Sequence, residues 1–208
     1  MSSVRRPRHE HAERAPVDTT SWAQAAYYLV IDLEATTSED ARAFPKHEME
    51  TIEIGAVLVR ASTSEVVDEL QQFVRPIRHP ILLPFCTKLK GIEQKTVDAA
   101  PLFPEAFAEL RTRMIANRDG LVVWGSWGDY DAEQLRQDCV LHGMHYDMPP
   151  HLNLKTALSA AQGWRKLGLS QAVARCGLPL LGMAHRGIDD ARNAARMLPW
   201  ILGNRRAK

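Results

Sequence analysis

Two carboxylates lie close together where an apolar segment, Tyr27 to Ile31, comes to its end. Asp32 and Glu34 are separated by one residue, so both side chains would project from one face if the segment is a strand that continues through them. Carboxylate oxygens suit magnesium or manganese, and a divalent cation would offset the repulsion between the two acids. The alternative is that the two residues are ordinary surface charges at the end of a strand. The D-x-E pair taken alone favours this alternative, because such pairs are common.

Two further groups of acidic residues lie at the ends of expected elements. Asp129 and Asp131 stand where a helix should open, a place where aspartate is also a good N-cap. Asp189 and Asp190 stand in the first turn of the last expected helix, shortly after His185, and can likewise be cap and first-turn charges. His185 alone is uninformative. Three separate acidic groups, each at an element end, are harder to explain independently than as one shared cation site.

The elements that must position these residues follow from the apolar pattern. The segment from Tyr27 to Leu33 is short, apolar and rich in β-formers, which predicts a strand buried on both faces. Two longer, partly alternating segments, Glu50 to Arg60 and Glu65 to Pro76, predict strands joined by a hairpin. A fourth strand is expected over Gly120 to Ser126, directly before Asp129.

Loops and helices should follow the first three strands. Prolines 76, 80 and 84 predict a loop. Helices are then expected to begin near Pro104, at Asp131, at the N-cap residues Asn153 and Ser170, and near Ile188. Strands first, and then strands and helices in alternation, indicate an α/β domain with a mixed sheet.

The order of these motifs resembles the DEDDh group of 3′–5′ exonucleases. D-x-E follows the first expected strand, an aromatic residue and Asp follow the fourth, and H-x4-D enters the last helix. Finer similarity, in "FCTKLKGIEQKTVDAAPLFPEAF" and "WGSWGDYD", is to the branch that trims histone mRNA, small RNAs and ribosomal RNA ends. The resemblance covers about Tyr27 to Leu202. It implies a ribonuclease H-like fold with a mixed five-stranded sheet flanked by helices.

The resemblance also implies roles for individual residues. The metal-binding catalytic carboxylates would be Asp32, Glu34, Asp131 and Asp190, holding two Mg²⁺ ions for which Mn²⁺ could substitute. His185 would be the general base that takes a proton from the attacking water. The motif "GDYD" has two aspartates where the pattern needs one. Because the ligand follows an aromatic residue in the family, Asp131 is assigned, and Asp129 is left as a supporting or capping residue.

A nuclease also needs surfaces for phosphates and bases. Between Arg75 and Lys95 there are five lysines or arginines and one glutamate, which could follow a phosphate backbone, although a solvated loop fits this composition equally well. The substrate-binding candidates are Leu33, Ala35, Lys90, Ile92 and Trp127. Trp127 could stack on a base while Trp124 lies in the core, and a core position for both is the alternative.

Composition narrows the class of protein. The 208 residues, 45% of them hydrophobic, can bury the core of one domain, expected over residues 25–204 after a polar leader at residues 1–24. No apolar run approaches the ~20 residues of a membrane span. The three cysteines form no CxxC pair, which argues against a disulfide framework or zinc site and favours the cytoplasm. The net charge of +1 leaves any nucleic-acid binding to a local patch.

The sequence therefore predicts a metal-dependent 3′–5′ exoribonuclease. Its expected partner is single-stranded or 3′-tailed RNA, from whose 3′ end it would remove nucleoside 5′-monophosphates, with no membrane involved. An exonuclease acting on single-stranded DNA is one alternative, because the fold does not fix the sugar. A catalytically silent nucleic-acid-binding module and a metal-dependent phosphatase for small nucleotides are others. The presence of every required acid argues against silence, and the cleft candidates favour a polymer.

Overall fold

The computed structural model describes residues 20–40 and 44–207. Most of the leader expected over residues 1–24 therefore lies outside the described residues. Its last part forms helix α1 (Thr20–Ala23), in which Trp22 is buried and stacks on Tyr28 with the ring centroids 5.1 Å apart. Helix α1 therefore lies within the stretch expected to be a polar leader, and its Trp22 packs onto the domain.

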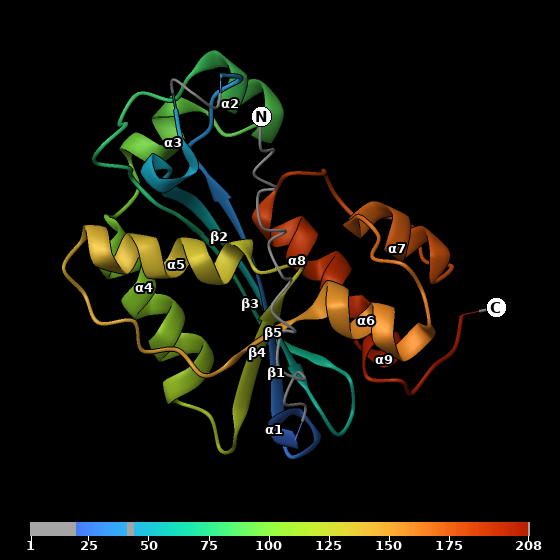
Figure 1. Cartoon of the computed structure of the whole chain (residues 1–208). Helices are drawn as coiled ribbons and strands as arrows, with labels where there is room; N and C mark the ends of the chain where they lie inside the picture. Colours follow the sequence, from blue (N-terminus) through green and yellow to red (C-terminus); the bar gives the residue numbers. More distant parts are fainter. Residues whose placement is uncertain (1–19, 41–43, 208) are drawn as a thin grey trace, which may run out of the picture.

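A five-stranded mixed sheet forms the centre of the molecule, with the strand order β3-β2-β1-β4-β5 (Figure 1). The central strand β1 is antiparallel to β2 and parallel to β4; β2 is antiparallel to β3, and β4 is parallel to β5. The strands are β1 (Tyr27–Ala35), β2 (Thr51–Arg60), β3 (Val66–Phe73), β4 (Val122–Ser126) and β5 (His151–Asn153). The α/β class and the mixed five-stranded sheet expected from the sequence are confirmed.

The helices follow the expected order with local differences. They are α2 (Pro84–Lys90), α3 (Gln94–Asp98), α4 (Phe103–Arg111) continuing into a π-helical turn (Thr112–Ala116), α5 (Tyr130–Leu141), α6 (Leu154–Gln162), α7 (Leu169–Arg175), α8 (Gly187–Arg196) and α9 (Leu198–Ile201), with a short 3₁₀ turn at Lys46–Glu48. None of the helices within residues 20–40 and 44–207 combines the length and apolar character that crossing a bilayer requires.

Two expected boundaries are wrong. Pro84 does not extend the loop but begins α2, since a proline in the first helical turn loses no hydrogen bond. Ser170 lies inside α7 and does not cap it; Gly168 precedes the helix, and its amide donates to the Gln171 side chain over 3.4 Å. Asn153 caps α6 as expected, accepting a hydrogen bond from the Thr156 amide over 2.9 Å.

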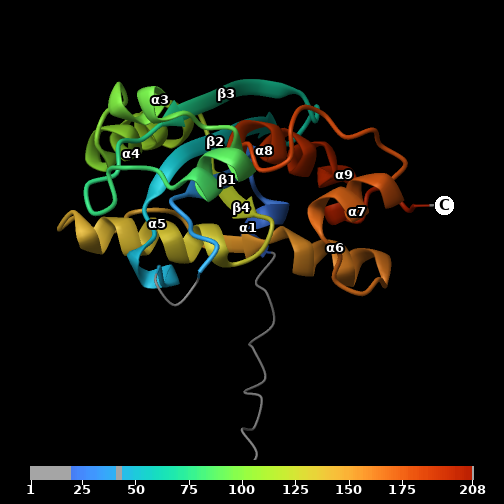
Figure 2. The same ribbon diagram turned by 90° about the horizontal axis from the view of Figure 1, so that it is seen from above.

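Different helices cover the two faces of the sheet (Figures 1 and 2). Leu29 and Ile31 of β1 point into a cluster with α4 and α5, whereas Val30 points into a cluster with α6, α7, α8 and α9. Because side chains alternate along a strand, Asp32 and Glu34 lie on the Val30 face, the face that α8 covers.

Helix α8 approaches this face through a contact between two glycines. A Cβ atom added to Gly55 of β2 would lie 2.0 Å from the carbonyl carbon of Gly187, the first residue of α8. One added to Gly187 would lie 2.9 Å from the Asp32 carbonyl oxygen. Any larger residue at either position would push the helix away. The glycine pair therefore sets how closely the start of α8 lies to the acidic end of β1.

Candidate active site

The carboxyl end of β1 supplies two acidic side chains to the site. In the antiparallel register Asp32 lies opposite Gly55, and Glu34 lies opposite Glu53 of β2. Glu34 is only 4% exposed, and Asp32 is half-buried. Because Gly55 has no side chain, space remains beside Asp32 for the first turn of α8.

Helix α5 brings a third carboxylate to the same place. Asp131, the second residue of α5, is buried, and its Oδ1 accepts a hydrogen bond from the Leu33 amide over 2.9 Å. This bond ties the start of α5 to β1 between the two acids of that strand. Asp129 precedes the helix. Its charge raises the pKa of His151 of β5, against the larger effect of burial, which lowers that pKa. The structure thus brings Asp131, the aspartate assigned from the motif, to the acids of β1.

Helix α8 and the turn before it supply the remaining two candidates. Asp190 lies in the first turn of α8, and its Oδ2 accepts a hydrogen bond from the His185 amide over 3.0 Å. His185 is exposed and has a φ of 61°, a left-handed conformation that few non-glycine residues adopt. One possible ligand atom from each of Glu34, His185 and Asp190 lies within 4.8 Å of the others. The five predicted catalytic residues therefore converge from β1, α5 and α8.

Burial and mutual repulsion make this group of carboxylates electrostatically unfavourable. Burial raises the pKa of Asp32 well above its usual value, and the charges of Asp131, Glu34 and Asp190 raise that pKa further. Burial also raises the pKa values of Glu34 and Asp190, and that of Asp131 to about 6. A nearby cation would favour the ionised form of all four acids.

A lysine lies inside this acidic group. Lys90, the last residue of α2, is 8% exposed, and its ammonium forms an ion pair with Glu34. Its charge lowers the pKa of both Asp32 and Glu34, against the larger effect of burial. Lys90 was expected to bind substrate; in the structure it contacts a carboxylate of the site.

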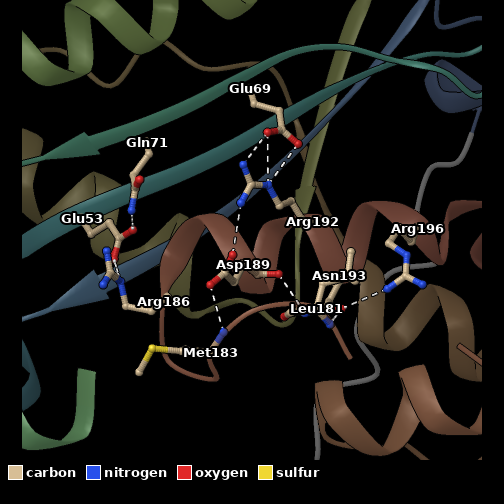
Figure 3. A network of polar contacts seen from close by, with 10 residues as sticks. All are labelled: Glu53, Glu69, Gln71, Leu181, Met183, Arg186, Asp189, Arg192, Asn193 and Arg196. Carbon is tan, nitrogen blue, oxygen red and sulfur yellow. Dashed lines mark hydrogen bonds and ion pairs between the residues drawn. The ribbon is translucent and has the colours of Figure 1, made fainter. Parts of the chain in front are cut away.

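The loop that carries His185 is fastened to α8 by side chains on one face of that helix (Figure 3). Asp189 accepts a hydrogen bond from the Met183 amide over 2.9 Å. Asn193, one turn later, accepts from the Leu181 amide over 3.0 Å and donates to the Leu181 carbonyl over 2.9 Å. The loop is exposed, yet its backbone is held by the helix that also carries Asp190.

Two ion pairs that no sequence motif predicted connect this unit to the sheet (Figure 3). Arg186 donates through Nε to Glu53 over 3.2 Å, and Glu53, which is fully buried, also accepts from the Gln71 side chain over 2.8 Å. Arg192 pairs with Glu69 of β3 over 2.6 Å. The sequence does contain one sign of such a pair, which is Glu53 within the apolar stretch "ETIEIGAV". A charged residue buried in a strand needs a buried partner.

The other substrate-binding candidates are largely enclosed. Leu33, Ala35 and Ile92 are buried, Ile92 in a small core cluster beside α2. Trp127 is half-buried against the α6–α9 side of the core, and its Nε1 donates to the Leu167 carbonyl over 3.3 Å. Trp124 is fully buried, as expected. Of the lysines and arginines between positions 75 and 95, all except Lys90 are exposed.

The donor set fits divalent cations. Oxygen ligands from Asp and Glu, together with waters, suit Mg²⁺ and Mn²⁺ better than softer metals. Asp32, Glu34, Asp131 and Asp190 are held near one another by strand register, the Leu33 amide and the glycine contact of α8, at an electrostatic penalty that bound cations would remove. These four carboxylates are therefore the residues that could hold metal ions.

Comparison with known proteins gives concordant results. The family model described as "Exonuclease" (RNase_T) matches residues 29–198. ERI1 exoribonuclease 3 of Homo sapiens is 32% identical over 185 residues, covering 84% of this chain and 53% of that protein. The 3′-5′ exonuclease Snipper of Drosophila melanogaster is 31% identical over 193 residues, covering 83% of this chain and 68% of that protein. The chain thus spans about half the length of the human relative.

A solved structure extends the comparison to the fold. The nuclease domain of 3′hExo, described as a DEDDh family member bound to rAMP, superposes with a TM-score of 0.79 at 27% identity. The superposition covers 86% of this chain and 93% of that domain.

The sheet order, and the acids that meet at the carboxyl end of β1, define a ribonuclease H-like domain of the DEDDh class. The chain belongs to the RNase_T exonuclease family. The recognition made from the sequence motifs is confirmed. Membership in this family implies divalent metal ions.

Proposed function

We propose that the protein is a 3′–5′ exoribonuclease that removes nucleoside 5′-monophosphates from single-stranded or 3′-tailed RNA. The observation that carries this proposal is the convergence of four carboxylates and His185 from β1, α5 and α8, in a chain of the exonuclease family. The reaction breaks the bond between phosphorus and the 3′ oxygen of the penultimate nucleotide, which leaves a new 3′ hydroxyl.

The acids have a binding role in this proposal. Asp32, Glu34, Asp131 and Asp190 hold two Mg²⁺ ions, for which Mn²⁺ can substitute. Bound cations would supply charge stabilisation at the attacked phosphate and lower the pKa of the attacking water. The Leu33 amide orients Asp131, and the His185 amide orients Asp190, so each carboxylate keeps its remaining lone pairs for binding.

His185 is proposed as the general base. It is exposed and lies beside Glu34 and Asp190, so it can accept the proton of a water molecule that attacks a phosphate in the site. The hydrogen bond from the His185 amide to Asp190, together with the left-handed backbone conformation, fixes the backbone position from which the imidazole extends. The side chains that hold Leu181 and Met183 steady the rest of the turn.

RNA is proposed over DNA because the chain is similar to exoribonucleases. ERI1 exoribonucleases 2 and 3 are among them, and one similar structure is described as recognition of a histone mRNA stem-loop by a 3′-exonuclease. Single-stranded DNA is the second candidate, because Snipper is named only as a 3′-5′ exonuclease. The exposed basic residues Arg75, Arg78, Lys88 and Lys95 are the proposed contacts for the rest of the strand.

The cellular setting is part of the same proposal. Cys86, Cys139 and Cys176 are free thiols, as in proteins of a reducing compartment, and we assign the enzyme to the cytoplasm. The proposed catalytic domain is residues 25–204, extended at its start by α1.

The test uses 5′-labelled RNA and DNA of one sequence, each with a free or a phosphorylated 3′ end, in Mg²⁺ or EDTA. We expect a ladder that shortens by one nucleotide on RNA with a free 3′ end, slower products from DNA, and none in EDTA. Preference for DNA would favour the second candidate. Internal cuts, or full activity in EDTA, would contradict the proposal.

A further inference from the structure

Lys90 places a fixed positive charge in the group of carboxylates. Its ammonium pairs with Glu34, one of the four proposed metal ligands, and 92% of the residue's surface is buried against the protein. Glu34 is itself buried, so each of these two charges has lost most of its contact with water. Removing either partner of such a pair is unfavourable, because the other charge is then buried and uncompensated.

The backbone that carries Lys90 is held in place at the end of α2. Lys90 ends α2, and Gly91 follows in the left-handed conformation, φ 64°, with its amide donating to the Thr87 carbonyl over 2.8 Å. Cys86 and Ile92, on either side of the helix end, are buried in one core cluster. The helix end is therefore anchored at both sides, and the lysine side chain extends from it to Glu34.

The charges explain what this arrangement does. Four ionised carboxylates and Lys90 give the site a charge of about −3. The lysine therefore supplies part of the positive charge that divalent cations would otherwise supply. Two divalent cations with Lys90 give about +1, the complement of one phosphodiester. A cation that takes Glu34 must first displace the Lys90 ammonium, which then needs another anion nearby.

We propose that Lys90 competes with a divalent cation for Glu34, so that the second metal ion binds well only when a nucleotide phosphate accepts the lysine. This inference rests on the proposed function, because it takes Glu34 as a metal ligand. Lys90 thereby couples occupancy of the second metal position to the presence of substrate. A lysine that serves only to neutralise a buried glutamate would not link metal binding to nucleotide.

Calorimetric titration of the full chain with Mn²⁺, with and without adenosine 5′-monophosphate, tests the coupling. The wild type should bind one ion per chain alone and two with the nucleotide. Lys90→Met removes the ammonium and keeps an unbranched side chain one atom shorter. It should bind two ions without nucleotide, the second at least about tenfold more tightly than in the wild type, a factor equal to ~1.4 kcal/mol. Lys90→Arg should behave like the wild type.

Lys166→Met is the matched control, because Lys166 is an exposed lysine in the loop between α6 and α7, and its titration should be unchanged. Unaltered or weaker Mn²⁺ binding by Lys90→Met would overturn the inference, as would two ions bound by the wild type without nucleotide. If Lys90→Met does not fold, Lys90→Gln, which can still donate a hydrogen bond to Glu34, replaces it. The comparison of the wild type with and without nucleotide needs no variant. A wild type that binds no Mn²⁺ even with nucleotide contradicts the proposed function, whereas equal binding by both proteins contradicts only the role of Lys90.

Discussion

Asp138 is a buried carboxylate outside the group formed by Asp32, Glu34, Asp131 and Asp190, and its replacement gives a prediction that depends on pH. It lies on α5, 1% exposed, and its Oδ2 accepts hydrogen bonds from the Thr51 hydroxyl over 2.6 Å and from the Gln134 side chain over 3.1 Å. Thr51 begins β2 and pairs with Ala35 of β1. Asp138 therefore holds the helix that carries Asp131 against the end of the sheet where the site lies.

Burial raises the pKa of Asp138 to about 6 from a usual value of 3.8. The folded protein thus holds this proton more tightly than the unfolded chain does. Stability from this group is complete below about pH 4 and is lost as the pH rises through about 6. The difference of about 2 pKa units corresponds to roughly 3 kcal/mol at most.

Asp138→Asn should remove this loss, because the amide oxygen can accept the same hydrogen bonds without a charge. We expect the free energy of unfolding of the variant, relative to the wild type, to be greater by roughly 2 kcal/mol at pH 8 than at pH 4. Urea unfolding in EDTA, followed by tryptophan fluorescence, measures this difference. Asp147→Asn, an exposed aspartate paired with Arg111, is the control and should show little change with pH. A difference that does not depend on pH, or that is larger at pH 4, would refute the reasoning.

Three further predictions concern the site directly. Gly55→Ala should destabilise the fold by about 1–3 kcal/mol or more and lower kcat, because its Cβ would overlap Gly187; wild-type urea unfolding would contradict the contact. Asp131→Asn should abolish RNA degradation, whereas Asp129→Asn should retain most of it; the reverse order in kcat would reassign the motif. Arg186→Met should destabilise the fold by roughly 3–5 kcal/mol and increase amide exchange at Met183 and His185, because it leaves Glu53 buried without its ion-pair partner. Adding Glu53→Gln should restore part of the stability, and no recovery in the double variant would show that the pair is not coupled.

The sequence predicted the parts of the fold that local periodicity specifies. The apolar run at Tyr27 and the alternating residues of β2 gave the sheet, and the period of two correctly placed Asp32 and Glu34 on one face. It did not locate β5, because three residues are too few to show an alternation, and this strand exists through its pairing with β4. Trp22 was likewise assigned to a leader, since its partner Tyr28 becomes its neighbour only through folding.

The candidate site was predictable where a motif carries the residue. D-x-E and H-x4-D identify four of the five positions, and the aromatic residue before Asp131 separated it from Asp129. Partners that come from distant elements left no such pattern. Glu53 and Arg186 are 133 residues apart, and Lys90 meets Glu34 across 56 residues, so each pair is visible only in the folded chain.

Anomalous diffraction from a crystal soaked with Mn²⁺ and adenosine 5′-monophosphate tests the central claim most directly. The account predicts two manganese peaks about 3.5–4 Å apart, coordinated by Asp32, Glu34, Asp131 and Asp190. It also predicts that the Lys90 ammonium leaves Glu34 for the nucleotide phosphate. Manganese bound elsewhere, or absent from these four carboxylates while the nucleotide is present, would contradict it.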